Sequence, residues 1–136
     1  MKQLIKNHGP KMFLGGFFLG VLMFAVVAFN TGRNQDKPPR EIVLLATDVA
    51  FHLTGETARP NPTLTLKKGA PVKLVIRNTD PEKLLHCFTI GGLNVKTTGS
   101  LAGGASETLL FTPKERGTFV YACLLHPSMS GKLVVE

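Results

Sequence analysis

The C-terminal stretch GTFVYACLLHPSMSGKLVVE, residues 117–136, carries the strongest indication of fold in this sequence. Its two ends, 118–123 and 131–135, are short runs rich in apolar and β-branched residues, and a seven-residue segment separates them. Runs of this length and composition predict two β-strands joined by a short loop. We expect functional side chains in this loop.

Similar strand signals continue through the preceding part of the chain. From Glu41 onward, short apolar runs alternate with Gly, Pro, Asn and Asp, and no 11-residue stretch shows helical periodicity. Further strands are predicted at 41–48, 63–66, 71–78, 85–90 and 107–111. Residues 54–62, which contain Gly and Pro, are expected to form a loop. About seven short strands in residues 41–136 predict an all-β domain built as a two-sheet sandwich.

The loop between the two C-terminal strands contains side chains that bind soft metal ions. Cys123 ends the first strand, and His126 and Met129 follow it at C-x2-H-x2-M spacing. So short a loop can bring a thiolate, an imidazole and a thioether to one point, but a fourth donor must come from elsewhere. Of the chain's four histidines, one precedes an N-terminal apolar segment and His52 has no partner at ligand spacing. His86, in a neighbouring predicted strand, is therefore the expected fourth donor.

The combination of these four donors favours copper. Two imidazoles and a thiolate in a trigonal plane, with a long axial bond to a thioether, describe the blue-copper class of electron-transfer sites. Zinc sites use nitrogen, oxygen or thiolate donors and have no need of a methionine. A saturated site of this kind leaves no position for a substrate. We therefore expect one copper per chain and the transfer of single electrons rather than enzymatic catalysis, with copper delivery or storage as the alternative function.

The same region resembles the cupredoxin family. The segments HCFTIGGLNVKT (86–97) and GTFVYACLLHPSMSGKLVVE (117–136) are similar to the C-terminal half of cupredoxins. The short C-x2-H-x2-M loop is similar to that of the amicyanins, which are bacterial periplasmic electron carriers. Upstream, ATDVAF (46–51) and LKKGAPVKLVIRNTD (66–80) are similar to the first cupredoxin strands. The resemblance covers residues 41–136 and implies a Greek-key β-sandwich with copper at one end.

The resemblance also assigns a role to each donor. It implies that His86 and His126 are the equatorial imidazoles, Cys123 the thiolate and Met129 the axial ligand. The sequence departs from the family at Cys87, where many cupredoxins have an asparagine that ties the two ligand loops together. We consider three roles for Cys87: a hydrogen-bonding neighbour of Cys123, which we favour, a disulfide partner of Cys123 when copper is absent, or an extra ligand.

An uncharged apolar segment, MFLGGFFLGVLMFAVVAF at 12–29, lies upstream of the domain. A helix of this length covers roughly 27 Å, close to the ~30 Å hydrocarbon core of a bilayer. The segment follows a basic N-terminus at 1–11 and precedes a polar linker at 30–40, so the positive-inside rule places the domain on the extracytoplasmic side. We favour a retained transmembrane anchor; the alternative is a signal peptide cleaved near Ala28, which would release a periplasmic or secreted domain.

The formal net charge of +7 does not indicate a nucleic-acid-binding protein. Residues 1–40 hold six of the sixteen Lys and Arg but one of the nine Asp and Glu, so most of the excess positive charge flanks the apolar segment. In that position the charge sets membrane topology. We therefore expect no nucleic-acid partner. For an electron carrier beside a membrane, we expect membrane-bound or periplasmic redox proteins as donor and acceptor.

Overall fold

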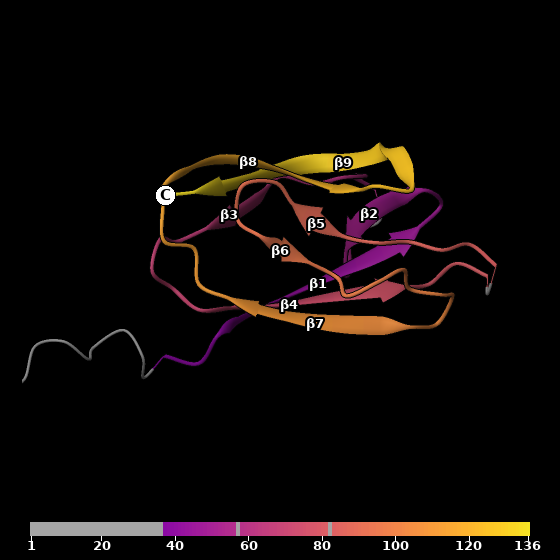
Figure 1. Cartoon of the computed structure of the whole chain (residues 1–136), viewed down its shortest axis with the longest axis horizontal. Helices are drawn as coiled ribbons and strands as arrows, with labels where there is room; N and C mark the ends of the chain where they lie inside the picture. Colours follow the sequence, from indigo (N-terminus) through magenta and orange to yellow (C-terminus); the bar gives the residue numbers. More distant parts are fainter. Residues whose placement is uncertain (1–36, 57, 82) are drawn as a thin grey trace, which may run out of the picture. The chain divides into compact units, whose positions relative to one another are not determined.

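The computed structural model describes residues 37–56, 58–81 and 83–136. These residues form nine β-strands in two sheets (Figure 1). The predicted basic N-terminus at 1–11, the apolar segment at 12–29 and most of the linker at 30–40 lie outside the described residues. Within the described part of the chain, no helix has the length and hydropathy needed to cross a membrane.

The first sheet has four strands in the order β2, β1, β4, β7. Its strands are β1 (Arg40–Thr47), β2 (Ala50–Leu53), β4 (Val72–Asn78) and β7 (Ser106–Phe111). β1 pairs antiparallel with β2 and parallel with β4, and β4 pairs antiparallel with β7. In β1 and β4 every second side chain is buried, as expected for strands with one face on a core.

The second sheet has five strands in the order β3, β9, β8, β5, β6. Its strands are β3 (Leu64–Leu66), β5 (Thr89–Ile90), β6 (Val95–Lys96), β8 (Gly117–Cys123) and β9 (His126–Val135). β8 and β9 form the central antiparallel hairpin, and β3 runs parallel to β9. Figure 1 shows this sheet lying over the first one, with the β8–β9 turn at the end opposite the C-terminus.

An aromatic cluster in the buried core joins the two sheets. Phe51 of β2 packs edge-on against Phe88 and Tyr121, with ring centroids 5.4 and 5.7 Å away. Such edge-to-face pairs add specific packing to the burial of apolar surface. Each sheet also contains neighbouring strands that are not consecutive in the sequence, such as β1 and β4 or β3 and β9, so the chain crosses between the layers as a Greek-key sandwich requires. The predicted all-β sandwich is confirmed.

Strand boundaries differ from the sequence prediction near the candidate donors. The sequence does not predict β2 or β6, and the strand expected at 85–90 shortens to β5. His86 instead forms an isolated β-bridge with Leu101. β9 begins at His126, so His126 and Met129 lie in a strand rather than in a loop. Segments this short give no clear alternation, and pairing with distant parts of the chain decides their conformation.

Candidate metal centre

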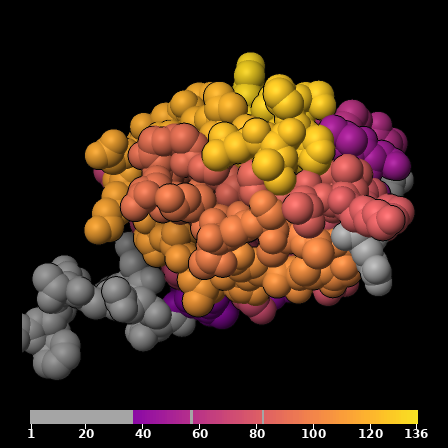
Figure 2. All heavy atoms as spheres, turned by 45° about the vertical axis from the view of Figure 1, so that its right-hand side comes forward, coloured from indigo at the N-terminus to yellow at the C-terminus, as the bar shows by residue number. Residues whose placement is uncertain are grey.

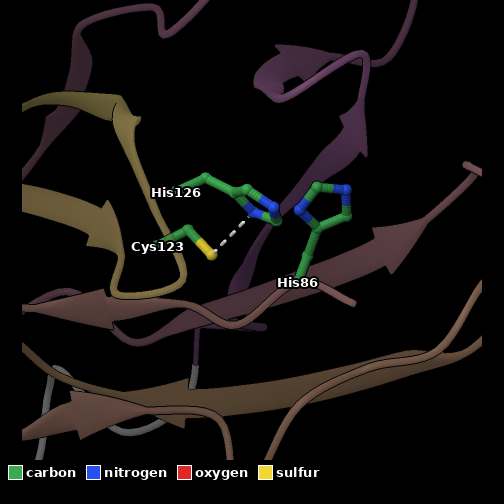
Figure 3. Close-up of side chains that lie close together, drawn as sticks. All are labelled: His86, Cys123 and His126. Carbon is green, nitrogen blue, oxygen red and sulfur yellow. Dashed lines mark hydrogen bonds between the residues drawn. The ribbon is translucent and has the colours of Figure 1, made fainter. Parts of the chain in front are cut away.

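Three of the four predicted donors converge at one end of the sandwich. The ligand atoms of His86, Cys123 and His126 lie within 4.8 Å of one another (Figure 3). Cys123 ends β8, His126 begins β9, and His86 lies between β4 and β5. The imidazole rings of His86 and His126 have centroids 4.9 Å apart. Donors from two distant parts of the sequence therefore meet in one group.

A tight hairpin positions Cys123 and His126. The two residues pair across the Leu124–Leu125 turn, and the register of β8 shifts between Ala122 and Cys123 as in a β-bulge. A bulge changes the direction in which the side chains of a strand point. Cys123 Sγ lies 3.8 Å from His126 Nδ1, with the cysteine buried and the histidine partly exposed.

Met129 lies on β9, three residues after His126. Its side chain is fully buried in the apolar cluster that also contains Cys123. An interior thioether is a weak donor that can approach a soft metal ion. The assignment of Met129 as axial ligand stays a prediction. His52, for which the sequence predicts no ligand role, lies on β2 outside the group.

His86 is completely buried, and its two ring nitrogens have different surroundings. Its Nε2 lies 2.7 Å from Asp80 Oδ2, whereas its Nδ1 has no hydrogen-bond partner among the described residues. Backbone N–H···O bonds of 3.1 and 2.6 Å exchanged with Leu101 hold the residue in place. If the Nε2–H group donates this hydrogen bond to the carboxylate, Nδ1 carries the free lone pair that a metal ligand needs. The unpaired buried nitrogen therefore fits a metal site.

Asp80 is a residue beside the candidate donors that the sequence pattern does not identify. Its Oδ1 accepts hydrogen bonds from Thr47 Oγ1 and from the backbone N–H of Asp48, each 3.0 Å long. Burial raises the pKa of the Asp80 carboxyl, but hydrogen bonds from His86, Asp48 and Thr47 outweigh burial and hold the pKa below its ordinary value. Asp80 is therefore an ionised acceptor for His86. In the sequence, Asn-Thr-Asp-Pro at 78–81 is typical of a turn, and only its closeness to His86 points to another role.

Asn78 fixes the conformation of the loop that carries Asp80 and His86. Its side chain is fully buried, and its Nδ2 donates to the carbonyl oxygens of Leu84 and Leu101 at 2.7 and 2.8 Å. Its Oδ1 accepts a 3.0 Å hydrogen bond from the Asp80 N–H. One side chain thus satisfies three backbone groups around His86. These hydrogen bonds connect the loop to β4, which ends at Asn78.

Cys87 connects the two halves of the site. Its N–H donates to Cys123 Sγ at 3.2 Å, and its own Sγ accepts a 3.1 Å hydrogen bond from the Leu124 N–H. Both thiols are free and their sulfur atoms are 3.5 Å apart, whereas a disulfide needs about 2.05 Å. Burial raises the pKa of the Cys87 thiol, and the opposing effect of the Leu124 N–H does not cancel it. This geometry favours the hydrogen-bonding role for Cys87.

The donor set fits a single thiophilic metal ion. Thiolate and thioether sulfur suit Cu(I), and imidazole serves both oxidation states of copper. The described residues supply a buried thiol, two imidazoles and an interior thioether at this end of the sandwich. Copper is therefore the metal ion whose ligand preferences these residues match best.

The outer edge of the site is apolar. Leu124 and Leu125 of the turn are 77% and 48% exposed, and Leu85 is 44% exposed. Figure 2 turns this end of the sandwich forward and shows the C-terminal strand, in yellow, beside parts of the domain from much earlier in the sequence. Exposed apolar side chains next to a buried site are typical of surfaces that contact other proteins.

Comparisons with known proteins agree with this geometry. The family model of the cupredoxin-like domain matches residues 19–135. Rusticyanin from Thiobacillus ferrooxidans is similar with a TM-score of 0.59 and 24% identity, over 71% of this chain and 76% of rusticyanin. Auracyanin B has a TM-score of 0.57 and 21% identity, over 74% of this chain and 91% of its own. A variant of amicyanin has a TM-score of 0.50 and 23% identity, over 71% and 82%.

A search of curated protein sequences found no matching relative. The likenesses to solved structures concern the fold, because their identities are low. The family model, in contrast, matches most of the chain, from residue 19 to residue 135. The resemblance found in the sequence is confirmed, and this chain belongs to the cupredoxin-like domain family.

Proposed function

We propose that this protein transfers single electrons through one mononuclear type 1 copper site, held by His86, Cys123, His126 and Met129. The observation that carries the proposal is the convergence of a thiol and two imidazoles within 4.8 Å, with a buried Nδ1 left unpaired on His86. Bound copper would supply the one-electron chemistry by cycling between Cu(I) and Cu(II). The protein's task is to hold the donors in one geometry for both oxidation states.

The described residues are suited to that task. Cys123 and His126 are fixed by a two-residue turn, and His86 is fixed by its backbone bridge to Leu101 and by Asp80. Four donors saturate the site, so no position remains for a substrate, and we propose that the protein is not an enzyme. The exposed leucines near His126 would allow a partner to approach the site closely.

Known relatives of this fold support a copper site. Rusticyanin is described as a copper protein, and the amicyanin structure contains Cu(I). The chain shares the fold of both proteins. Within the proposed function, donor and acceptor would be membrane-bound or periplasmic redox proteins that dock on the apolar edge formed by Leu85, Leu124 and Leu125.

Copper delivery or storage is the alternative. The Cys87 thiol favours it, because a second sulfur lies 3.5 Å from Cys123 Sγ and could give Cu(I) one more soft donor. The two functions differ in what happens to the metal. An electron carrier keeps its copper through repeated oxidation and reduction, whereas a delivery protein loses Cu(I) rapidly to an acceptor.

The test is a spectrum of the full chain loaded with Cu(II). We expect one copper per chain, an intense thiolate-to-copper charge-transfer band, and reversible redox cycling without metal loss. Cys123→Ser should abolish the band. Cys87→Ser is the matched control and should retain it, because Cys87 is a neighbour of the site rather than a ligand. An unchanged band in Cys123→Ser would refute the assignment.

The location of the domain is a separate part of the proposal. The apolar segment at 12–29 would anchor the chain with the domain on the extracytoplasmic side. Cell fractionation followed by N-terminal sequencing tests this. An intact N-terminus in the membrane fraction supports the anchor, and a soluble form beginning near Phe29 supports a cleaved signal peptide.

A further inference from the structure

A buried carboxylate lies against the ring of His86. Asp80 Oδ2 and His86 Nε2 are 2.7 Å apart, and the two side chains are 5% and 0% exposed. We propose that Asp80 is a positioning residue that keeps the His86 proton on Nε2, leaves Nδ1 free for the metal and strengthens His86 as a donor. The inference rests on the proposed copper site and identifies a residue that sets its affinity and potential.

The carboxylate is held in one orientation. Thr47 Oγ1 and the Asp48 N–H both donate to Oδ1, which leaves Oδ2 for His86. Asp48 and Val49 form the β1–β2 turn with positive φ angles of 50° and 58°, the pair of left-handed residues that a type I′ hairpin requires. This turn leaves the Asp48 N–H without a ladder partner, and it binds Asp80 instead. The hairpin and the ligand loop are thereby coupled through one side chain.

A buried carboxylate behind a ligand histidine changes the strength of that ligand. It fixes the ring orientation and the tautomer, and it raises the basicity of the nitrogen that faces the metal. Cu(II) carries more positive charge than Cu(I), so it gains more from a stronger donor and from the nearby negative charge. Removal of the carboxylate should therefore weaken Cu(II) binding more than Cu(I) binding and raise the reduction potential.

Asp80→Asn is the most informative variant because it keeps the shape of the side chain. If the amide oxygen keeps the hydrogen bonds from Thr47 and Asp48, the amide NH2 group faces His86 Nε2. His86 must then accept at Nε2 and carry its proton on Nδ1, which is the wrong tautomer for a metal ligand at Nδ1. The same substitution behind the histidine of a serine-protease triad selects a wrong tautomer.

We expect Asp80→Asn to lower Cu(II) affinity about 10- to 100-fold, the range seen when such outer partners are mutated. Cu(I) affinity should fall less, and each tenfold difference between the two losses raises the potential by about 59 mV. Glu107→Gln is the matched control. Glu107 also accepts a backbone hydrogen bond, 2.9 Å from the Thr98 N–H, but it is outside the donor group. Its substitution should change neither affinity nor potential.

The tautomer of His86 gives a readout that a purely structural role would not change. Nitrogen-15 NMR of the copper-free full chain should place the proton on Nε2 in the wild type and on Nδ1 in Asp80→Asn. A wild-type proton on Nδ1 would overturn the proposal, and this measurement decides it even if the variant fails to fold. Wild-type copper affinities and potential in a folded Asp80→Asn would overturn it equally. Absence of the charge-transfer band in the wild type would instead refute the copper site itself.

Discussion

The two halves of the candidate site are built in opposite ways. The half that contains His86 lies in the interior: His86 and Asn78 are fully buried, and Asp80 as a whole residue is 8% exposed. Side-chain hydrogen bonds connect these three residues to one another and to the loop backbone. The hairpin half is at the surface, where Leu124 is 77% exposed and His126 is partly exposed.

The two halves would meet two different requirements of electron transfer, a fixed ligand geometry and access for a partner. In the proposed function, a buried and hydrogen-bonded half would fix the geometry of the ligands, so that a change of oxidation state would need little rearrangement. An exposed half brings one ligand close to the surface, where a partner can approach. Variants that act on one half alone should therefore have distinguishable effects.

Substitution of the two histidines gives the largest contrast. His86→Ala leaves a cavity and a buried carboxylate without its imidazole partner, so we expect a loss of about 3–5 kcal/mol in the unfolding free energy of the copper-free protein. His126→Ala should cost less than about 1 kcal/mol, because the side chain is partly exposed. Denaturant unfolding of both variants measures this, and equal losses would contradict the comparison. Both variants should lose the charge-transfer band.

Asn78→Ala tests the buried half without touching a donor. It removes the partners of the Asp80 N–H and of the Leu84 carbonyl group, and it leaves the Leu101 carbonyl with the His86 N–H alone. Unpaired buried polar groups cost about 1–3 kcal/mol each, so we expect a loss of at least about 2 kcal/mol and a broadened copper spectrum. Thr108→Ala, on the exposed face of β7, is the control and should stay within about 0.5 kcal/mol of the wild type. A wild-type stability for Asn78→Ala would show that the network is unimportant.

Met129→Leu should change the potential more than the stability. Leucine fills a similar buried volume, and the cost in unfolding free energy should be below about 1.5 kcal/mol. Leucine offers no donor, and loss of a weak axial ligand disfavours Cu(II), so the potential should rise while copper is retained. Voltammetry of the loaded protein measures the shift. An unchanged potential would exclude Met129 as the axial ligand.

Leu124→Lys should have the smallest effect on stability, within about 0.5 kcal/mol, because the side chain is exposed. In electron self-exchange, two copies of the protein meet. If electrons leave through the hairpin half, the two introduced lysines should repel each other and slow self-exchange about tenfold or more. Leu110→Lys is the matched control, since Leu110 is 71% exposed on β7. An equal slowing by both variants would exclude a specific exit at the hairpin.

The sequence by itself determined the parts of this protein that depend on local spacing. Alternating apolar residues over 72–78 suffice to predict a half-buried strand, because the period of a strand is fixed by backbone geometry. The C-x2-H-x2-M spacing predicted that Cys123 and His126 lie together, since three residues of chain cannot separate them far. His86 followed from the need for a second imidazole. A sequence pattern therefore describes best those features that depend on residues close together along the chain.

The tertiary structure decided the features that depend on distant contacts. Asp80 becomes the partner of His86 only because the β1–β2 turn, more than 30 residues away in the sequence, holds its other oxygen. The same dependence explains why the sequence does not predict β2 and β6, and why the strand expected at 85–90 shortens to β5: the pairing of these strands is stabilised by neighbours rather than by their own composition. A local pattern can place donors side by side, but the orientation of a buried ring nitrogen depends on hydrogen-bond partners that only the folded chain brings together.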